Sequence, residues 1–172
     1  MDIVIRKALC DDAYDYANCH ISCWQSAYKG IVSDEFLHNL PNEIENRTER
    51  YKEAFKNPDS CEHYCVEHEG EMIGFLNFGK SNDEDKPHAG DVIAIYLKQE
   101  FWGKGYGWTM MDYAVERLKQ LGHNEIFLWT FEKNNRAKRF YEKYGFTHDG
   151  VSKELSYWGG PMTLVRYVFM RN

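Results

Sequence analysis

The spacing of apolar residues predicts that the first third of the chain is mostly helical. A short apolar segment at residues 3–8 alternates like a strand. Asp11 or Asp12 is placed to cap the helix that follows, and Ser33 to open a shorter helix. A polar, helix-prone segment spans residues 42–55. The first helix has one apolar face with a spacing of three or four residues, formed by Ala13, Ala17, Ile21, Trp24 and Tyr28.

After residue 60 the pattern changes to short apolar runs that are typical of strands, with two helices between them. Residues 91–97 are almost all apolar, which predicts a strand covered on both faces. The predicted strands are 63–68, 72–78, 91–97, 125–130, 146–151 and 164–170, and the predicted helices are 107–121 and 134–143. These elements favour an α/β (α+β) fold with a central, mixed but mainly antiparallel sheet of about seven strands, flanked by helices. No repeat or linker divides the chain, so we expect residues 1–172 to form a single domain.

The composition limits what this fold can bind. The chain has 172 residues and a net charge of −6, and 43% of its residues are hydrophobic. Such an acidic chain is a poor candidate for a nucleic-acid partner, because that partner needs basic surface against its phosphates. No apolar stretch approaches the length of about 18 residues that a membrane span needs. The odd number of five cysteines, without an export signal, favours reduced thiols in the cytoplasm.

One group of residues raises the question of a metal site. Cys61, His63, Cys65 and Glu67 fall on the same face of a predicted strand. No second cluster with zinc-like spacing accompanies them. We therefore expect no metal.

The strongest chemical signal is a glycine-rich turn between the strand at 91–97 and the helix at 107–121. Gly103, Gly105 and Gly107 alternate there with other residues. Glycine lets the backbone come close to a ligand, and the amides at the start of a helix attract an anion such as pyrophosphate. The spacing fits neither the nucleotide P-loop nor the dinucleotide-binding fingerprint. Taken alone, the turn is also compatible with a plain tight connection.

A second motif follows one strand and one helix downstream. It consists of Asn134, Ala137, Phe140, Tyr141, Lys143, Gly145 and Phe146. Together with the glycine turn, it resembles the coenzyme loop and the later signature of the GNAT superfamily of acyl-CoA-dependent N-acetyltransferases. The runs Trp24-x-x-x-Tyr28-x-Gly30-Ile31 and Val165-Arg166-Tyr167 look like a small, stand-alone bacterial branch of that superfamily. Trp102 departs from the family pattern, which usually has Arg or Gln at this place in the loop.

The resemblance implies transfer of an acetyl group from acetyl-CoA to a primary amine by direct attack. Tyr141 is then the expected general acid, because a phenol with a pKa near 10 is protonated at neutral pH and can give its proton to the departing thiolate. The other interpretation of Tyr141 is a core aromatic. Asp91 is the leading candidate for the general base, with a solvated strand end as the alternative. The residues that the resemblance assigns to acetyl-CoA are Ile95, Tyr96, Leu97, Gly103, Lys104, Gly105, Tyr106, Gly107, Trp108 and Asn134.

The resemblance also indicates where the acceptor binds. Trp24, Tyr28 and Trp129 are expected to line its pocket, with Tyr157 and Tyr167 as additions, although each of these residues alone is more typical of a core. An aromatic pocket in an acidic chain favours a cationic amine, either a small molecule or part of a protein. A homodimer is compatible with pairing of the closing strands between copies. Two other functions stay open: a CoA-binding sensor or partner-binding module without activity, and a nucleotide-binding domain of another kind.

Overall fold

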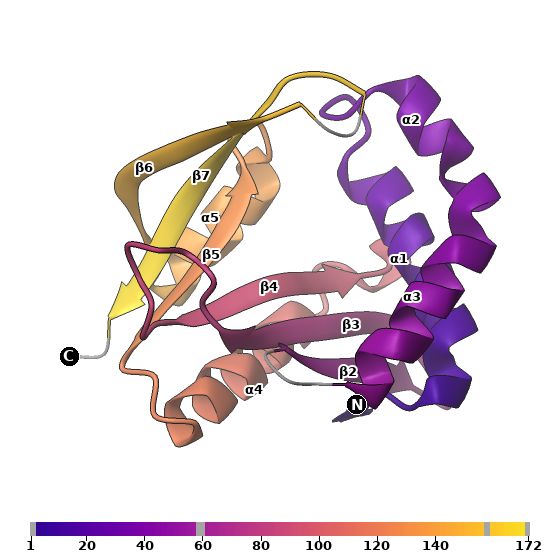
Figure 1. The fold of residues 1–172 in the computed structure, drawn as a ribbon, viewed down its shortest axis with the longest axis horizontal. Helices are drawn as coiled ribbons and strands as arrows, with labels where there is room; N and C mark the ends of the chain where they lie inside the picture. The colour runs from indigo at the N-terminus through magenta and orange to yellow at the C-terminus, as the bar shows by residue number, and fades with distance from the viewer. Residues whose placement is uncertain (1–2, 58–60, 157–158, 171–172) are drawn as a thin grey trace.

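The computed structural model describes residues 3–57, 61–156 and 159–170, and these residues form one seven-stranded sheet (Figure 1). The strand order is β1-β2-β3-β4-β5-β7-β6, and every neighbouring pair is antiparallel except β4 and β5, which are parallel. The strands are β1 (Val4–Lys7), β2 (Cys61–His68), β3 (Glu71–Lys80), β4 (Gly90–Leu97), β5 (Glu125–Phe131), β6 (Thr147–Leu155) and β7 (Met162–Met170). The predicted mixed, mainly antiparallel α/β fold is confirmed.

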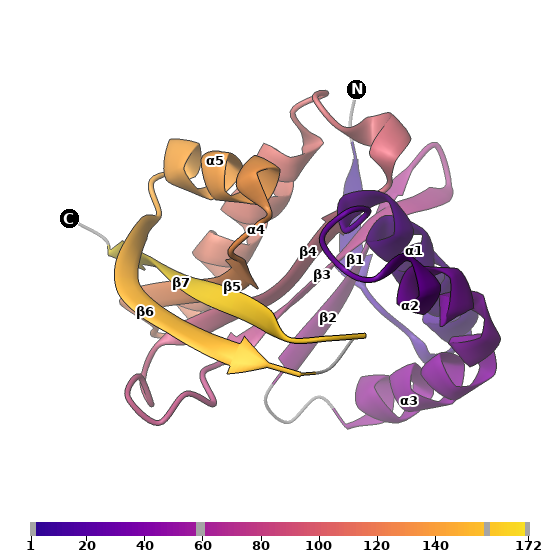
Figure 2. The ribbon, with the colours of Figure 1, turned by 90° about the horizontal axis from the view of Figure 1, so that it is seen from above.

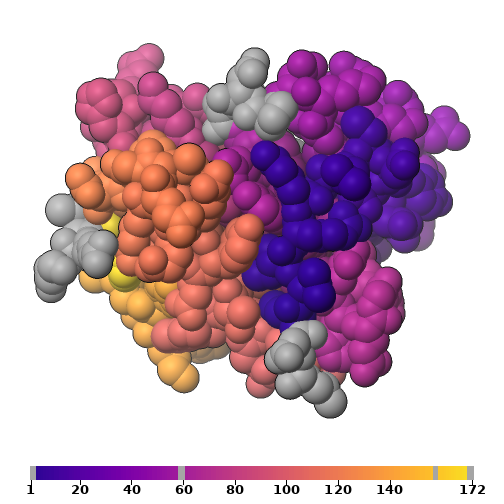
Figure 3. All heavy atoms as spheres, turned by 90° about the horizontal axis from the view of Figure 1, so that it is seen from below, coloured from indigo at the N-terminus to yellow at the C-terminus, as the bar shows by residue number. Residues whose placement is uncertain are grey.

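Helices cover the sheet on both faces (Figures 1 and 2). On one face lie α1 (Ala13–Ala27), α2 (Asp34–Asn39) and α3 (Ile44–Lys56), and on the other lie α4 (Tyr106–Gln120) and α5 (Asn135–Tyr144). Short 3-10 turns precede α1, α3 and α4 at Cys10–Asp12, Leu40–Glu43 and Gln99–Phe101. Figure 3 shows the N-terminal segment, in indigo, beside the orange segment of α4, in agreement with the packing of Ile3 and Ile5 on the α4 side of the core.

The helix starts follow the expected capping logic at Ser33 but not at Asp12. The Ser33 hydroxyl accepts a hydrogen bond from the Phe36 N–H (3.1 Å) and so caps α2. The Asp12 side chain makes no capping bond to α1. It accepts hydrogen bonds from the Leu9 N–H (2.7 Å) and from the Arg6 guanidinium, because the 3-10 turn turns it back toward β1.

The core has a layer on each face of the sheet. Met110, Met111 and Leu118 of α4 are fully buried against the sheet, as the predicted apolar stripe requires. On the other face Tyr16 packs against Phe75 with a ring separation of 4.7 Å. Within the described part of the chain, no helix has both the length and the apolar character needed to cross a lipid bilayer.

Candidate active site

The two parallel strands β4 and β5 separate almost as soon as they meet. Their ladder contains only Gly90 with Ile126 and Asp91 with Phe127. A bulge between β3 and β4 falls just beyond this point, where the register shifts between the Asn77 and Gly79 pairs. Beyond Asp91 the edge of β4 that faces β5 is therefore unpaired. The prediction that residues 91–97 are covered on both faces is wrong in part, since Ile93 beside this gap is 47% exposed.

The unpaired edge of β4 presents specific backbone groups. The Lys98 N–H donates to the Ile73 carbonyl of β3 (2.8 Å). Because hydrogen-bonded and non-hydrogen-bonded pairs alternate along an antiparallel ladder, the N–H and C=O of Tyr96 also point to β3, whereas those of Ile95 and Leu97 point into the gap. The Leu97 carbonyl accepts a hydrogen bond from the Trp102 indole N–H (2.7 Å), which leaves its N–H available.

The glycine turn connects this edge to the start of α4. Gly103 and Gly105 have φ angles of +76° and +86°, a left-handed conformation that favours glycine, and the space above each is open. The N–H groups of Gly103, Lys104, Gly105 and Gly107 donate to no backbone carbonyl of the described residues. The Trp108 N–H, which was expected to be available, donates to the Gly105 carbonyl (3.0 Å) because α4 has already begun there. The turn thus supplies free donors at the positive end of a 15-residue helix.

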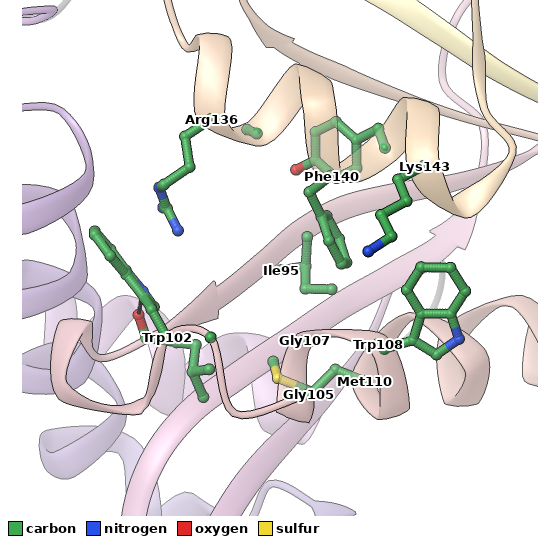
Figure 4. A pocket seen from close by; sticks show the side chains of 13 residues that line it. Ile95, Trp102, Gly105, Gly107, Trp108, Met110, Arg136, Phe140 and Lys143 are labelled. Carbon is green, nitrogen blue, oxygen red and sulfur yellow. Dashed lines mark hydrogen bonds between the residues drawn. The ribbon is translucent and has the colours of Figure 1, made fainter.

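A groove of about 360 Å³ runs from the glycine turn between α4 and α5 (Figure 4). We call it the α4–α5 groove. Arg136 and Lys143 project into it from α5, opposite Trp102 and Trp108. The Arg136 guanidinium lies 3.5 Å from the centre of the Trp102 ring, within range of a cation–π contact. The groove therefore combines apolar walls with two cations near the helix start.

A second, smaller cavity of about 70 Å³ fills the gap between β4 and β5. We call it the strand split. Ile95, Leu97, Arg136, Ala137 and Tyr141 line both the strand split and the α4–α5 groove, so the two spaces adjoin. Tyr28 and Trp129 line the strand split but not the groove. A ligand in the groove can therefore extend between the strands toward the face that α1 covers.

Tyr141 lies where the two cavities meet. Its side chain is only 8% exposed, and burial raises its pKa to about 12, while the Arg136 guanidinium acts in the opposite direction. The phenol is therefore protonated at neutral pH and can donate a proton or a hydrogen bond. Its position is part of a buried cluster and also of the cavity lining, so both sequence interpretations of Tyr141 describe part of its environment.

Asp91 is the last residue of β4 that pairs with β5. It lines neither of the two cavities, but it sits at the apex of the strand split on the face that α3 covers. Gly79 pairs with both Asp91 and Cys61, and the Asp91 charge helps to raise the pKa of the Cys61 thiol. Its Oδ1 atom is buried and has no hydrogen-bond partner among the described residues. Burial, with a smaller contribution from Asp83, raises the Asp91 pKa to about 7, against the effect of Lys153.

The aromatic residues expected around the acceptor divide into two groups. Tyr28 and Trp129 line the strand split, and the Tyr28 hydroxyl is 2.5 Å from that of Tyr96. Trp24 lines neither cavity, because its ring packs edge-on against Tyr28 at 4.9 Å and is 7% exposed. Tyr167 was also placed wrongly: it lies in the core on the α4–α5 face and donates to Glu142 (2.8 Å). Tyr157 lies outside the described residues.

Three further residues take positions that the sequence did not make clear. The Asn134 side-chain oxygen accepts from the Ala137 N–H (3.1 Å), so this residue caps α5 as well as lining the strand split. Lys104 extends away from the turn over the Phe101 ring at 4.8 Å. Tyr106 is buried next to His68, with ring centroids 5.6 Å apart. Lys104 and Tyr106 can therefore serve a ligand through their backbone rather than their side chains.

Sequence reasoning missed two cationic residues of the groove. Arg136 was grouped with a basic cluster on a solvated helix face, and Lys143 was taken only as part of a motif. The helical repeat carried a signal, because Arg136, Phe140 and Lys143 are spaced by four and three residues and so share one face of α5. What the repeat does not contain is the position of Trp102, which that face meets across the groove.

Comparison with known proteins gives the site its context. Residues 24–146 match the model of the acetyltransferase (GNAT) family. The chain is 27% identical over 143 residues to an uncharacterized N-acetyltransferase of Bacillus subtilis, YuaI, covering 83% of this chain and 79% of that protein. It is 26% identical over 121 residues to the spermine/spermidine N(1)-acetyltransferase of the same organism, covering 66% of this chain and 79% of that protein.

The fold also matches solved structures. PaiA N-acetyltransferase from Thermoplasma acidophilum, solved with coenzyme A, superposes with a TM-score of 0.76 at 20% identity, covering 99% of this chain and all of that one. A GCN5-related N-acetyltransferase from Rhodopseudomonas palustris gives a TM-score of 0.78 at 15% identity, covering 99% and 97% of the two chains. At these identities the likeness concerns the fold. Because the family model spans most of the chain, the protein belongs to the GNAT family and is an acetyltransferase.

Proposed function

We propose that this enzyme transfers the acetyl group of acetyl-CoA to a primary amine that attacks the thioester directly. The observation that carries the proposal is the junction of the α4–α5 groove with the strand split. One end of this continuous space offers free amides and cations, and the other end offers Tyr28 and Trp129. This order suits a long anionic donor that delivers its reactive end to an acceptor on the opposite face.

The groove and the turn fit the donor substrate. The free N–H groups of residues 103–107 suit the pyrophosphate, and Arg136 and Lys143 suit further phosphate charge. The N–H groups of Ile95 and Leu97 suit the amide groups of the pantetheine arm, which would extend the sheet in place of β5. We retain Ile95 and Leu97 for this role, and we assign Tyr96 to the acceptor side through its side chain.

The chemistry then needs few groups. The amine nitrogen attacks the thioester carbon, the carbonyl oxygen becomes an oxyanion, and the carbon–sulfur bond breaks as the amide forms. A free N–H on the β4 edge can donate to that oxyanion. Tyr141 gives a proton to the departing thiolate, and its burial keeps this proton in place until sulfur develops charge.

Asp91 is the candidate for the proton taken from the amine. With a pKa of about 7, a substantial fraction of this carboxyl is ionised at neutral pH, while it remains basic enough to accept a proton. It lies at the apex of the strand split and lines neither cavity, so a water molecule between Asp91 and the amine is part of the proposal.

The acceptor is proposed as an amine by the chemistry of the relatives. One relative is named as a spermine/spermidine N(1)-acetyltransferase, and another, matched over 51% of this chain, as a mycothiol acetyltransferase. Tyr28 and Trp129 would contact the acceptor, with Trp24 supporting Tyr28 from behind. The proposal keeps residues 1–172 as one domain, and the cytoplasmic location and a homodimer remain predictions.

Release of free CoA thiol over a panel of primary amines tests the proposal. Tyr141→Phe should lower kcat by about a hundredfold while acetyl-CoA affinity, measured by calorimetry, stays unchanged. Tyr167→Phe is the matched control, because it removes a phenol bonded to Glu142 in the core, and it should keep kcat. Binding of acetyl-CoA without thiol release on any amine would favour the alternative function, a CoA-binding sensor or partner-binding module.

A further inference from the structure

A third hollow lies on the acceptor side of the sheet, between α1 and α3. Its volume is about 270 Å³, and it is lined by His20, Arg47, Arg50, Tyr51 and Ala54. None of these residues belongs to the α4–α5 groove or to the strand split. We call it the Arg47–Arg50 hollow.

The hollow carries positive charge without a matching carboxylate. Arg6, Arg117 and Arg166 each pair with Asp or Glu at 3.1 Å or less. Arg47 and Arg50, in contrast, form no ion pair within the described residues.

Arg47 is also partly desolvated. Burial lowers the pKa of its guanidinium, and the neighbouring Arg50 charge lowers it further, against the effects of Tyr51 and Glu43. Two like charges held together, one of them partly desolvated, are unfavourable unless an anion joins them. A pair of solvated surface arginines would carry no such cost.

The uncharged lining of the hollow adds no negative charge. The His20 Nδ1 atom is 2.6 Å from the Tyr51 hydroxyl and 3.4 Å from an Arg47 terminal nitrogen. Since a guanidinium can only donate, Nδ1 is the acceptor and the proton of a neutral ring sits on Nε2. Burial, followed by the charges of Arg47 and Arg50, lowers the His20 pKa to about 3, so this ring is neutral at pH 7.

The hollow is connected to the reaction centre through aromatic rings. The His20 ring lies 5.7 Å from the Tyr96 ring, and Tyr96 lines the strand split. Asp91 lies on this same face of the sheet, at the apex of the split. Along this face, one end offers a carboxylate to an amine, and the other offers two guanidinium groups.

We infer that the Arg47–Arg50 hollow binds an anionic group, a carboxylate or a phosphate, carried by the amine that the enzyme acetylates. The inference rests on the proposed function and adds the acceptor class: amines with a negative charge at the end opposite the nitrogen. It reverses the expectation of a purely cationic acceptor, which followed from the net charge of −6. The local charge around the acceptor decides, because it acts at close range while the distant charges are screened.

Three acceptors of equal length test the inference by steady-state kinetics. 4-Aminobutyrate ends in a carboxylate, 4-aminobutanamide in a neutral amide, and 1,4-diaminobutane in an ammonium group. We expect KM to rise in that order, with a difference of about tenfold between the first two. Adding 2-aminoethyl phosphate to the panel distinguishes a phosphate from a carboxylate. Equal KM values, or the lowest KM for the diamine, would overturn the inference.

Arg50→Gln is the informative variant, because Arg50 is exposed and its loss leaves the core intact. It should raise KM for the anionic acceptors about tenfold and leave kcat and the KM of the neutral amine unchanged. Lys52→Gln removes the same charge from the same helix, but Lys52 pairs with Glu49 and lies outside the hollow, so it should change neither value.

A binding measurement keeps the inference testable even if none of these amines is turned over. We would titrate 4-acetamidobutyrate, the acetylated form of the anionic acceptor, into the CoA-loaded protein and follow the side-chain NMR signals of Arg47 and Arg50. The signals should shift with this ligand and not with N-butylacetamide, and Arg50→Gln should weaken the effect. Absence of any shift would overturn the inference, whereas absence of acetyl-CoA binding would overturn the proposed function instead.

Discussion

Asp91 shows how one residue couples the fold to the reaction. Its buried, unpartnered Oδ1 atom lies where the backbone changes from a paired to an open edge. Burial favours the neutral carboxyl and raises its pKa from 3.8 to about 7. The folded chain therefore holds a proton that the unfolded chain loses above about pH 4. This residue lowers stability as the pH rises from about 4 to 7, and the ionised form that results is the one the reaction needs.

The pH dependence of Asp91→Asn should separate these two effects. Native kcat/KM should rise with an apparent pKa near 7, in addition to the ionisation of the amine itself, and the variant should lose the limb near 7 together with most of its activity. Denaturant unfolding at pH 8 should find the variant more stable than the native chain by about 1–3 kcal/mol. A variant that keeps the limb near pH 7 would remove Asp91 from the reaction.

At the scale of elements, the start of α4 and the end of α4 form a natural pair for comparison. Gly105 precedes the helix with φ +86°, and Gly122 follows it with φ +94°. Neither position has an atom within 4 Å of where a Cβ would lie. The two glycines therefore have the same conformational demand, but only Gly105 lies in the α4–α5 groove.

Gly105→Ala and Gly122→Ala should cost about the same stability, about 1 kcal/mol each, because an L-residue is strained in the left-handed region. Only Gly105→Ala should weaken acetyl-CoA binding, by about tenfold or more, since its methyl group enters the space above the free amides. Thermal unfolding and calorimetry measure the two effects separately. Equal acetyl-CoA affinity in both variants would show that the turn is a plain connection.

The sequence predicted these local elements well because each depends on nearby residues. The apolar stripe of α4, the cap at Ser33 and the glycine turn all depend on spacing within a few positions. The separation of β4 from β5 could not be predicted, because it depends on where two distant strands stop pairing. The Arg47–Arg50 hollow was missed for the same reason: α3 is simply polar until His20 of α1 is placed beside it.

At the scale of the whole molecule, Arg166 ties the acceptor-side loop to the last strands. It is 3% exposed and contacts Asp85 (2.7 Å) in the loop between β3 and β4, and Asp149 (2.7 Å) in β6. Asp83 of the same loop accepts from the Trp129 indole (2.8 Å), which holds the wall of the strand split. The acidic loop, expected to be merely solvated, is therefore fixed by a buried cation.

Arg166→Met should lower the free energy of unfolding by about 2–4 kcal/mol at pH 7, because it leaves the two contacting carboxylates uncompensated. The Arg166 charge keeps the Asp85 pKa below its ordinary value, so this stabilisation is present above about pH 4 and is lost as the pH falls. The difference between variant and native chain should shrink at pH 3. Lys153→Met, at an exposed position 4.0 Å from Asp83, should cost less than about 1 kcal/mol.

The central claim is that acetyl-CoA occupies the glycine turn and the open edge of β4. Residue-resolved hydrogen exchange, with and without acetyl-CoA, tests it most directly. The amides of Ile95, Leu97, Gly103 and Gly105 should exchange fast in the free protein and become protected on binding. The Tyr96 amide, which is directed at β3, should change little and serves as the internal control. Protection elsewhere, or an unchanged edge of β4 in the presence of bound acetyl-CoA, would contradict the account.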